Sequence, residues 1–245
     1  MSWESSIKGF KSYLQIERSL SDNSVQAYIR DIKKFANYAI PLKLNELKIQ
    51  RKNISDFLAE LKDDGIAARS QARIISGIKA FYKYLIIEDY IKYDPTELIE
   101  SPKVGFKLPN TLSLIEIDKL ISAVDLSNKQ GERNRAILET LYSCGLRVSE
   151  LTNLKLSNIY FNEGYLKVIG KGDKERLAPI GGRALKYLTT YINEVRNHQT
   201  IKKGQEDFVF LNNRGAGLTR VMIFLIIQKL VTEIGLKKKI SPHTF

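Results

Sequence analysis

A short segment containing prolines, glycine and lysines constrains the fold of this 245-residue chain most strongly. Helical periodicity is regular before and after this segment and is interrupted within it. The interrupting residues are Pro95, Pro102, Gly105 and Pro109. Because a chain of this length can form one large domain or two ordinary ones, the interruption decides between them. We predict two domains, residues 1–101 and 112–245, joined by a linker over residues 102–111.

The first domain contains four segments in which apolar residues recur at helical spacing. They run from Trp3 to Leu14, from the capping cluster at residues 21–24 to Phe35, from about Lys52 to Lys62 and from about Ala68 to Glu88. The Ser, Asp and Asn side chains of the cluster can accept hydrogen bonds from free N–H groups, so they place the start of the second segment. The pattern predicts a compact four-helix bundle.

The second domain combines further helical segments with a β-hairpin. Helices are predicted over residues 113–124, 132–142, 183–195 and 219–234. Residues 165–169 and 175–179 have the character of strands and flank a glycine-containing turn at residues 170–173. The whole chain is therefore predicted to be mainly α, with an α+β second domain that holds a small antiparallel sheet.

The charge of the chain favours a nucleic-acid partner. Lys and Arg number 39 against 27 Asp and Glu, which gives a net charge of +12 and an isoelectric point of about 9.6. Such an excess attracts a polyanion without regard to sequence, and a merely solvated basic surface would explain it equally well. No basic amphipathic helix or lipidation signal favours a membrane, and the longest apolar run, Val221 to Ile227, is far shorter than a membrane span. We expect a cytoplasmic protein.

Cofactor chemistry has little support in the sequence. The single Cys144 excludes an internal disulfide and, with only two His, makes a zinc site unfavourable. We interpret Cys144 as a packing residue, since no neighbouring His or second Cys would activate it. Carboxylates at metal-binding spacing and a phosphate-binding GxxxxGK[ST] loop are missing from the sequence. We expect no metal and no cofactor.

Three short windows carry the candidate chemistry. They are Cys144 to Leu151 (CGLRVSEL), Ile169 to Arg176 (IGKGDKER) and Ser241 to Phe245 (SPHTF). Each contributes one cationic or proton-carrying side chain, and these are Arg147, Lys171 and His243. Together such groups can hold a phosphodiester and stabilise the extra negative charge of its transition state. Taken singly, they also fit a surface Arg packed over Glu150 or Glu139, a hairpin-tip Lys and a histidine at a helix start.

The order of these windows and the residues in them resemble the motifs of the tyrosine recombinases, and among them those of the Xer-type enzymes of chromosome resolution. The resemblance implies a SAM-like core-binding bundle followed by a catalytic domain that cuts and rejoins DNA through a 3′-phosphotyrosyl link without a cofactor. It assigns Arg147 to the non-bridging oxygens of the scissile phosphate, Lys171 to protonation of the leaving 5′ oxygen and His243 to proton transfer. Glu150 is expected to orient this region.

The resemblance also predicts a chain that is incomplete at its C-terminus. The family's second catalytic Arg and its nucleophilic Tyr have no counterpart in residues 1–245. Ser241 and Pro242 form a helix-start signal that only three residues follow. We therefore expect a truncated chain that binds DNA without cleaving it, with weakened contacts between protomers.

Further DNA contacts are predicted on both domains. Arg73 and Lys79 resemble the basic positions on the fourth helix of the core-binding bundle. Lys174 and Arg176 are either contacts to the DNA backbone or ion-pair partners within the hairpin, and the sequence leaves this open. Arg220, at a helix start, is a further candidate.

The expected partners follow from the resemblance. They are a double-stranded recombination site, a homo-tetramer or a hetero-tetramer with a sister recombinase on that DNA, and a DNA translocase as a regulator. Two alternatives remain open: a phage or mobile-element integrase, and a DNA-binding accessory protein that never cleaves.

Overall fold

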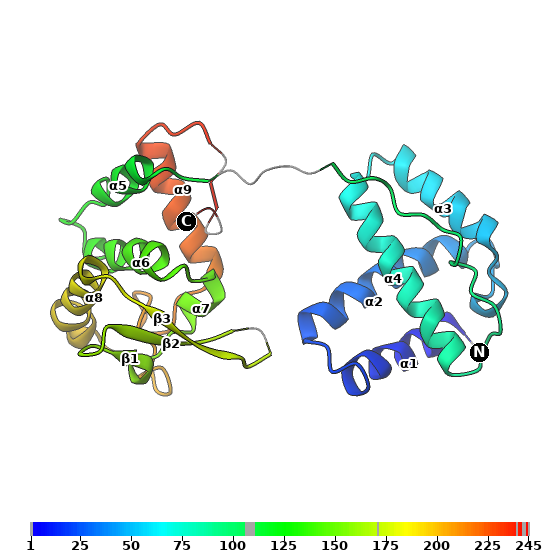
Figure 1. Ribbon diagram of the computed structural model, residues 1–245, viewed down its shortest axis with the longest axis horizontal. Coiled ribbons are helices and arrows are strands. Elements are labelled where there is room, and N and C mark those ends of the chain that lie inside the picture. The colour runs from blue at the N-terminus through cyan, green and yellow to red at the C-terminus, as the bar shows by residue number, and fades with distance from the viewer. Residues whose placement is uncertain (1, 106–110, 171, 239, 242–243, 245) are drawn as a thin grey trace. The chain divides into compact units, whose positions relative to one another are not determined.

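The computed structural model describes residues 2–105, 111–170, 172–238, 240–241 and 244. The chain divides into two compact units, residues 1–107 and 108–245, and the division falls inside the predicted linker. Both units are drawn in Figure 1 with their elements labelled. No helix among the described residues is both long and apolar enough to span a membrane.

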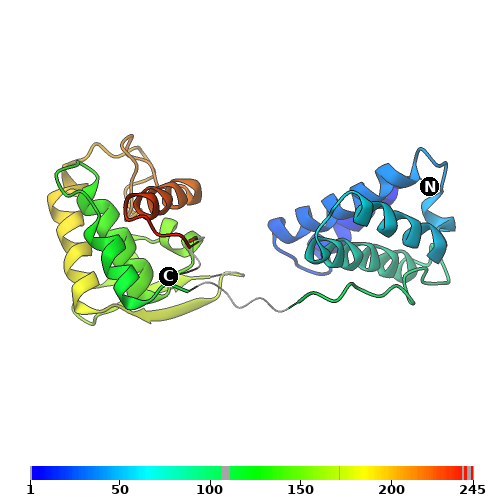
Figure 2. The same cartoon turned by 90° about the horizontal axis from the view of Figure 1, so that it is seen from above.

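The first unit is built from the four predicted helices. These are α1 (Trp3–Ile16), α2 (Asp22–Ala39), α3 (Arg51–Asp63) and α4 (Ala68–Ile87), with a short 3-10 turn, η1 (Glu46–Lys48), between α2 and α3. Helix α4 packs along α2 and also contacts α1 and α3. Figure 2 shows this bundle from a second side. Its buried positions recur at helical spacing, as the sequence pattern predicts.

Aromatic rings fill the centre of this bundle. Phe10, Phe35 and Phe81 are fully buried, and the Trp3 ring packs edge-on against Phe35 and stacked on Phe81. The Trp3 indole N–H donates to the carbonyl of Leu44 at 3.0 Å, so the buried ring has its one polar group satisfied. Aromatic packing therefore fixes α1 against α2 and α4, and the indole N–H ties it to the loop that leads into η1.

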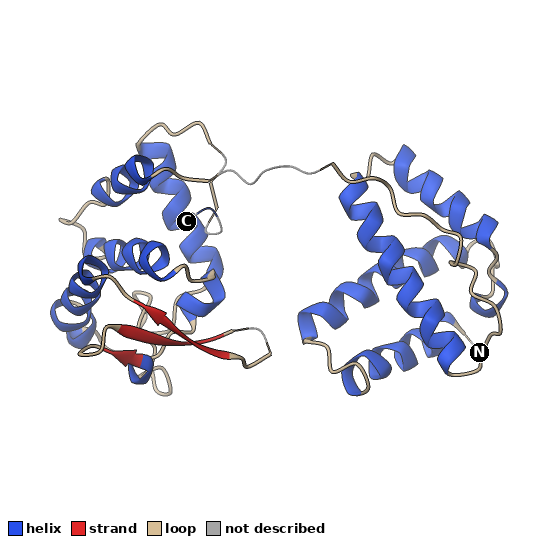
Figure 3. Ribbon diagram, in the orientation of Figure 1, coloured by secondary structure: helices blue, strands red, loops and turns tan. Residues whose placement is uncertain are grey.

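The second unit packs its helices against one side of a small sheet (Figure 3). Its helices are α5 (Leu114–Ser122), α6 (Gly131–Cys144), α7 (Val148–Thr152), α8 (Gly182–Glu194) and α9 (Arg220–Glu233), with 3-10 turns η2 (Leu156–Asn158) and η3 (Arg196–His198). Ser113 caps α5 in a reciprocal capping box with Glu116. Helices α6 and α8 make the most extensive contact, and α7 packs against α9.

Three antiparallel strands form the sheet in the order β1 (Ile159–Tyr160), β2 (Tyr165–Ile169), β3 (Glu175–Pro179). The hairpin of β2 and β3 agrees with the predicted ranges, and Leu166 pairs with Ala178 on the buried face. The sequence does not predict strand β1, because two residues are too few to show an alternating pattern. This strand pairs Tyr160 with Tyr165, whose rings stack 4.5 Å apart.

The end of α6 sets the direction of the chain into the first motif window. Gly145 adopts the left-handed conformation, with φ 54° and ψ 41°, and ends the helix. Arg147 then stands immediately before α7 as its N-cap.

Near the C-terminus, Ile240 is buried, and its carbonyl accepts a hydrogen bond from the Gln228 amide on α9. Only Ser241 and Thr244 are described beyond it, so the predicted helix at residues 241–245 is outside what the structure describes.

Candidate functional site

Arg147 lies on the surface and is held at one edge by Glu150. Its backbone N–H donates to Glu150 Oε2 at 2.8 Å, and its Nη1 donates to Oε1 at 2.9 Å. The Arg147 side chain is nevertheless 66% exposed. A guanidinium has five N–H donors in a planar arrangement. Because Glu150 binds only one edge of the Arg147 guanidinium, the other donors are available to a phosphate.

Glu150 also binds a second arginine, which comes from the hairpin. Arg176 on β3 donates from Nη1 to Glu150 Oε1 at 2.8 Å and from Nη2 to Oε2 at 3.0 Å. Burial by itself raises the pKa of Glu150, but the hydrogen bonds from Arg176 and Arg147 outweigh it and lower this pKa to about 2. The carboxylate is therefore ionised at neutral pH. Two guanidinium groups share one negative charge, so this cluster keeps a net charge of +1.

Arg176 makes an ion pair, but its partner lies outside the hairpin, so both roles that the sequence allows for it stay open. It makes a two-pronged contact with Glu150 on α7, a carboxylate whose side chain is 2% exposed. Its side chain is still 40% exposed, so its assignment as a DNA contact stays a prediction. Lys174 is exposed beside it and also stays a prediction.

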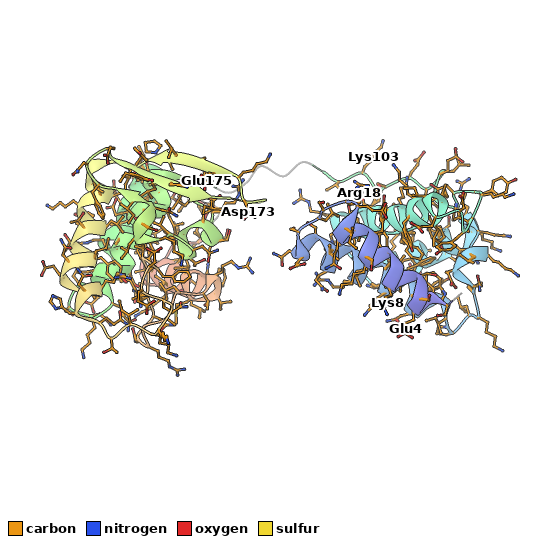
Figure 4. The ribbon with its side chains drawn as sticks, turned by 90° about the horizontal axis from the view of Figure 1, so that it is seen from below. Glu4, Lys8, Arg18, Lys103, Asp173 and Glu175 are labelled. Carbon is orange, nitrogen blue, oxygen red and sulfur yellow. The ribbon has the colours of Figure 1, made fainter. Side chains whose placement is uncertain are left out.

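The hairpin approaches Glu150 closely at Gly170. A side chain at Gly170 would meet Glu150 Oε1 at 3.4 Å, and the Gly170 N–H donates to the carbonyl of Lys174 at 2.8 Å. Asp173, which lies between the two strands, and Glu175 on β3 are labelled in Figure 4. Lys171, between Gly170 and Gly172, is outside the described residues, and so is His243. Their roles stay predictions carried by the resemblance.

Arg73 in the first unit has an internal partner. Its Nη1 donates to the carboxylate of Asp31 at 2.5 Å, and Asp31 is buried between α2 and α4 opposite Gly77. Burial raises the pKa of Asp31, and Arg73 counteracts this shift. Half of the Arg73 side chain is exposed, so a phosphate can still reach it. The roles of Arg73 and of the half-buried Lys79 in DNA binding stay predictions.

Arg220 is the first residue of α9 and is exposed. Thr219 caps this helix by accepting the N–H of Met222, which leaves other N–H groups of the first turn available to an anion. The role of Arg220 as a DNA contact also stays a prediction.

Cys144 has the properties of a packing residue. Burial raises the pKa of its thiol to about 11, so the thiol is protonated at neutral pH and is a poor nucleophile. It packs against the hydrophobic core of the second unit. Among the described residues, no group of three or more His, Cys, Asp or Glu side chains could hold a metal ion.

The first unit is a helical bundle. In the second unit, a hairpin is tied to an exposed Arg at the start of a helix. This arrangement is the one expected of a tyrosine recombinase. Profile comparisons agree with this class. The chain belongs to the phage integrase family: the profile "Phage integrase family" matches residues 110–245, and "Phage integrase, N-terminal SAM-like domain" matches residues 7–89.

Individual relatives agree with this assignment. The chain is 40% identical over 242 residues to "Tyrosine recombinase XerD" of Staphylococcus aureus (strain Mu50 / ATCC 700699), which covers 98% of this chain and 82% of that protein. The fold of this chain is similar to that of XerH site-specific recombinase bound to its palindromic difH substrate. The TM-score is 0.76, the identity is 19%, and the match covers 97% of this chain and 70% of that chain. The fold is also similar to a lambda integrase dimer bound to a core site. Here the TM-score is 0.76, the identity is 20%, and the match covers 100% of this chain and 67% of that chain. At these identities, the two structures support the fold only.

Proposed function

We propose that this chain belongs to a site-specific recombinase that cuts and rejoins DNA through a 3′-phosphotyrosyl link. The observation that carries the proposal is Arg147, which Glu150 holds at one edge while most of the side chain stays exposed. A bidentate guanidinium recognises two oxygens of one phosphate and keeps its charge at any physiological pH. Arg147 would therefore bind the non-bridging oxygens of the scissile phosphate.

The reaction needs two proton movements around that phosphate. A Tyr hydroxyl attacks phosphorus and gives its proton to a base, the bond from phosphorus to the 5′ oxygen breaks, and the 5′ oxygen takes up a proton. We assign Lys171 to the leaving oxygen and His243 to proton transfer near the phosphate, on the resemblance of their motifs. The phosphotyrosyl bond retains the energy of the phosphodiester, so rejoining requires no ATP. The family's nucleophilic Tyr has no counterpart in residues 1–245, and we propose that this stretch binds DNA without cleaving it.

The biological role proposed is chromosome dimer resolution. It is supported by the 40% identity with a protein named tyrosine recombinase XerD over almost the whole chain. A mobile-element integrase is the alternative role; the integrases of lambda and of transposon Tn1549 share the fold at 17% to 20% identity, a level that XerH also has, so it does not favour either role. A lambda integrase forms a tetramer on a Holliday junction. We propose the same number of protomers here, with an identical or a sister protomer as the partner and a DNA translocase as the regulator.

Selection of the target site from random DNA tests the proposal. The chain is incubated with a pool of random-sequence duplexes, and shifted complexes are recovered and amplified. We expect an enriched pair of inverted half-sites, because two-fold related protomers select a two-fold related sequence. The Arg147→Ala variant should bind the enriched duplex more weakly, with partial recovery in Arg147→Lys. A pool without enrichment would instead support a non-specific accessory protein.

Covalent chemistry is tested on the enriched duplex, nicked and end-labelled. Residues 1–245 are compared with a version extended by the residues of the Staphylococcus aureus relative that lie outside the matched region. An adduct that survives denaturing electrophoresis is expected from the extended chain only. An adduct from residues 1–245 would show that a nucleophile lies among them and that the site assignment is wrong.

A further inference from the structure

A basic cavity lies in the second unit, at the opposite end of α6 from Arg147. It has a volume of about 540 Å³ and lies among the start of α6, the end of α8, η3 and the loop after Leu211. Helix α6 has 14 residues and rises about 1.5 Å per residue, so roughly 20 Å separate its two ends. Figure 1 shows that α6 leads to α7 at its far end. The cavity is therefore distinct from the Arg147 site.

The lining of this cavity has one sign of charge. Lys129 and Arg133 contribute the positive charges, His198 adds an imidazole, and none of the described residues that line the cavity is acidic. The side-chain amides are those of Gln130, Gln199 and Asn213. Amide groups can donate as well as accept hydrogen bonds, so they suit the polar part of an anionic ligand.

Arg133 is a buried charge without an acidic partner among the described residues. It is 5% exposed, and its guanidinium donates to neutral oxygens only: the Leu211 carbonyl at 3.0 Å, Asn134 Oδ1 at 3.0 Å and, more weakly, Gln130 Oε1. Burial lowers its pKa, because a charged guanidinium is less favourable away from water. A buried charge is normally paired. An anion in the cavity would supply the missing negative charge.

We propose that this cavity binds the phosphate group of a small anionic ligand of mononucleotide size. The cavity volume lies within the usual range of small-molecule sites, about 300–1,000 Å³, and exceeds what an inorganic phosphate would fill. Arg133 and Lys129 neutralise the phosphate, and the amide groups face the remainder of the ligand. The same phosphate chemistry exists in the DNA backbone, which is the other source of the group.

The experiment uses the full 245-residue chain carrying Arg147→Ala, so that phosphate binding at the recombinase site does not contribute. Inorganic phosphate, adenosine monophosphate and adenosine are titrated separately at constant ionic strength. Binding is followed by calorimetry and by the imidazole C–H NMR signals, which are few because the chain has two His. The monophosphate should bind and shift the His198 signal, inorganic phosphate should bind more weakly, and adenosine should not bind.

Variants at the exposed rim keep the test independent of folding. Lys129→Ala combined with His198→Asn should weaken adenosine monophosphate binding about tenfold, since both residues are exposed and their replacement leaves the core intact. Lys186→Ala, an equally exposed lysine on α8 outside the cavity, is the matched control and should change nothing. Equal binding of adenosine and its monophosphate, or unchanged binding in the double variant, would overturn the proposal.

The source of the phosphate is decided by a DNA arm of the same experiment. If the DNA backbone occupies the cavity, Lys129→Ala weakens duplex binding and adenosine monophosphate competes with the duplex. If a small ligand occupies the cavity, duplex affinity is the same with and without the Lys129→Ala substitution. Both results presuppose that the cavity binds phosphate and are independent of whether the chain acts as a recombinase.

Discussion

Single residues in the Arg147 site act through a shared carboxylate. Glu150 orients Arg147 from within α7 and receives Arg176 from β3, so one buried side chain joins the helix to the hairpin. The sequence allows a surface Arg147 over Glu150 or Glu139, and in the structure the partner is Glu150. The sequence does not predict Arg176 as the second partner, because Glu150 and Arg176 are 26 positions apart and meet only through tertiary packing.

Replacing Arg176 tests its role as a positioning residue. Arg176→Ala should destabilise the catalytic unit by about 1.5–3 kcal/mol, because it removes two charge-assisted hydrogen bonds from a buried carboxylate. DNA affinity should fall as well, because Glu150 then has one guanidinium fewer to hold it in place beside Arg147, and Arg176→Lys should recover part of both the stability and the affinity. Lys174→Ala, two residues away and exposed, serves as the control for a simple loss of charge. Chemical denaturation and gel-shift titrations measure the two effects, and equal behaviour of both variants would contradict this role.

The ionisation of Glu150 predicts a specific pH dependence. Its pKa is about 2 in the fold against an ordinary value of 4.5, so its ion pairs stabilise the fold above pH 4.5. This contribution, roughly 2–3 kcal/mol, is lost as the pH falls from 4.5 towards 2. Glu150→Gln should therefore be less stable than the unchanged chain at pH 6, with the difference shrinking through that range. Unfolding by urea at several pH values measures it, and a difference independent of pH would refute the assignment.

At the scale of elements, local sequence signals determine where helices begin and end. Ser113, Thr219 and Gly145 occupy the cap positions that their side chains or backbone freedom favour. The four helices of the first unit and the β2–β3 hairpin agree with the predicted ranges within a few residues, because periodicity reflects which side of an element is buried. Strand β1 escapes such reasoning, since its pairing partner on β2 defines it.

Gly145 offers a test at this scale, because it directs the chain from α6 to Arg147. Its φ of 54° is unfavourable for a residue with a Cβ, while the space around it is open. Gly145→Ala should therefore cost about 1 kcal/mol through the backbone alone. Gly182→Ala on α8 is the matched control, since its surroundings are equally open and its φ is not left-handed; it should be neutral or slightly stabilising. Denaturation midpoints compare the two, and equal effects would contradict this explanation.

The whole molecule consists of two units with separate hydrophobic cores. Residues 1–105 and 111–245, produced separately, should each fold and unfold cooperatively, because each retains its own core. Circular dichroism and calorimetry of the two fragments, compared with the intact chain, measure this. Loss of cooperative unfolding in either fragment would show that its stability depends on the other.

The net charge of +12 predicts a strong effect of salt on DNA binding. If a complex neutralises six to ten phosphates, its affinity should fall by about 10³-fold or more between 50 and 200 mM salt. Arg220→Ala should reduce the slope of log affinity against log salt by about one if Arg220 contacts a phosphate. The exposed Lys229 on the same helix provides the comparison, as Lys229→Ala should leave the slope unchanged. Fluorescence anisotropy with one duplex at five salt concentrations measures both slopes.

The sequence by itself determined the two units, their helices, the hairpin and the family, because periodicity, caps and motifs act over short stretches of chain. The tertiary structure alone decided which charges meet. Arg176 reaches Glu150 across 26 residues, and Arg133 reaches the carbonyl of Leu211 across 78. Such pairs depend on the register of β2 and β3 and on the packing of α6 beside the loop at Leu211. Neither leaves a local pattern, since the partners share no element and no fixed spacing.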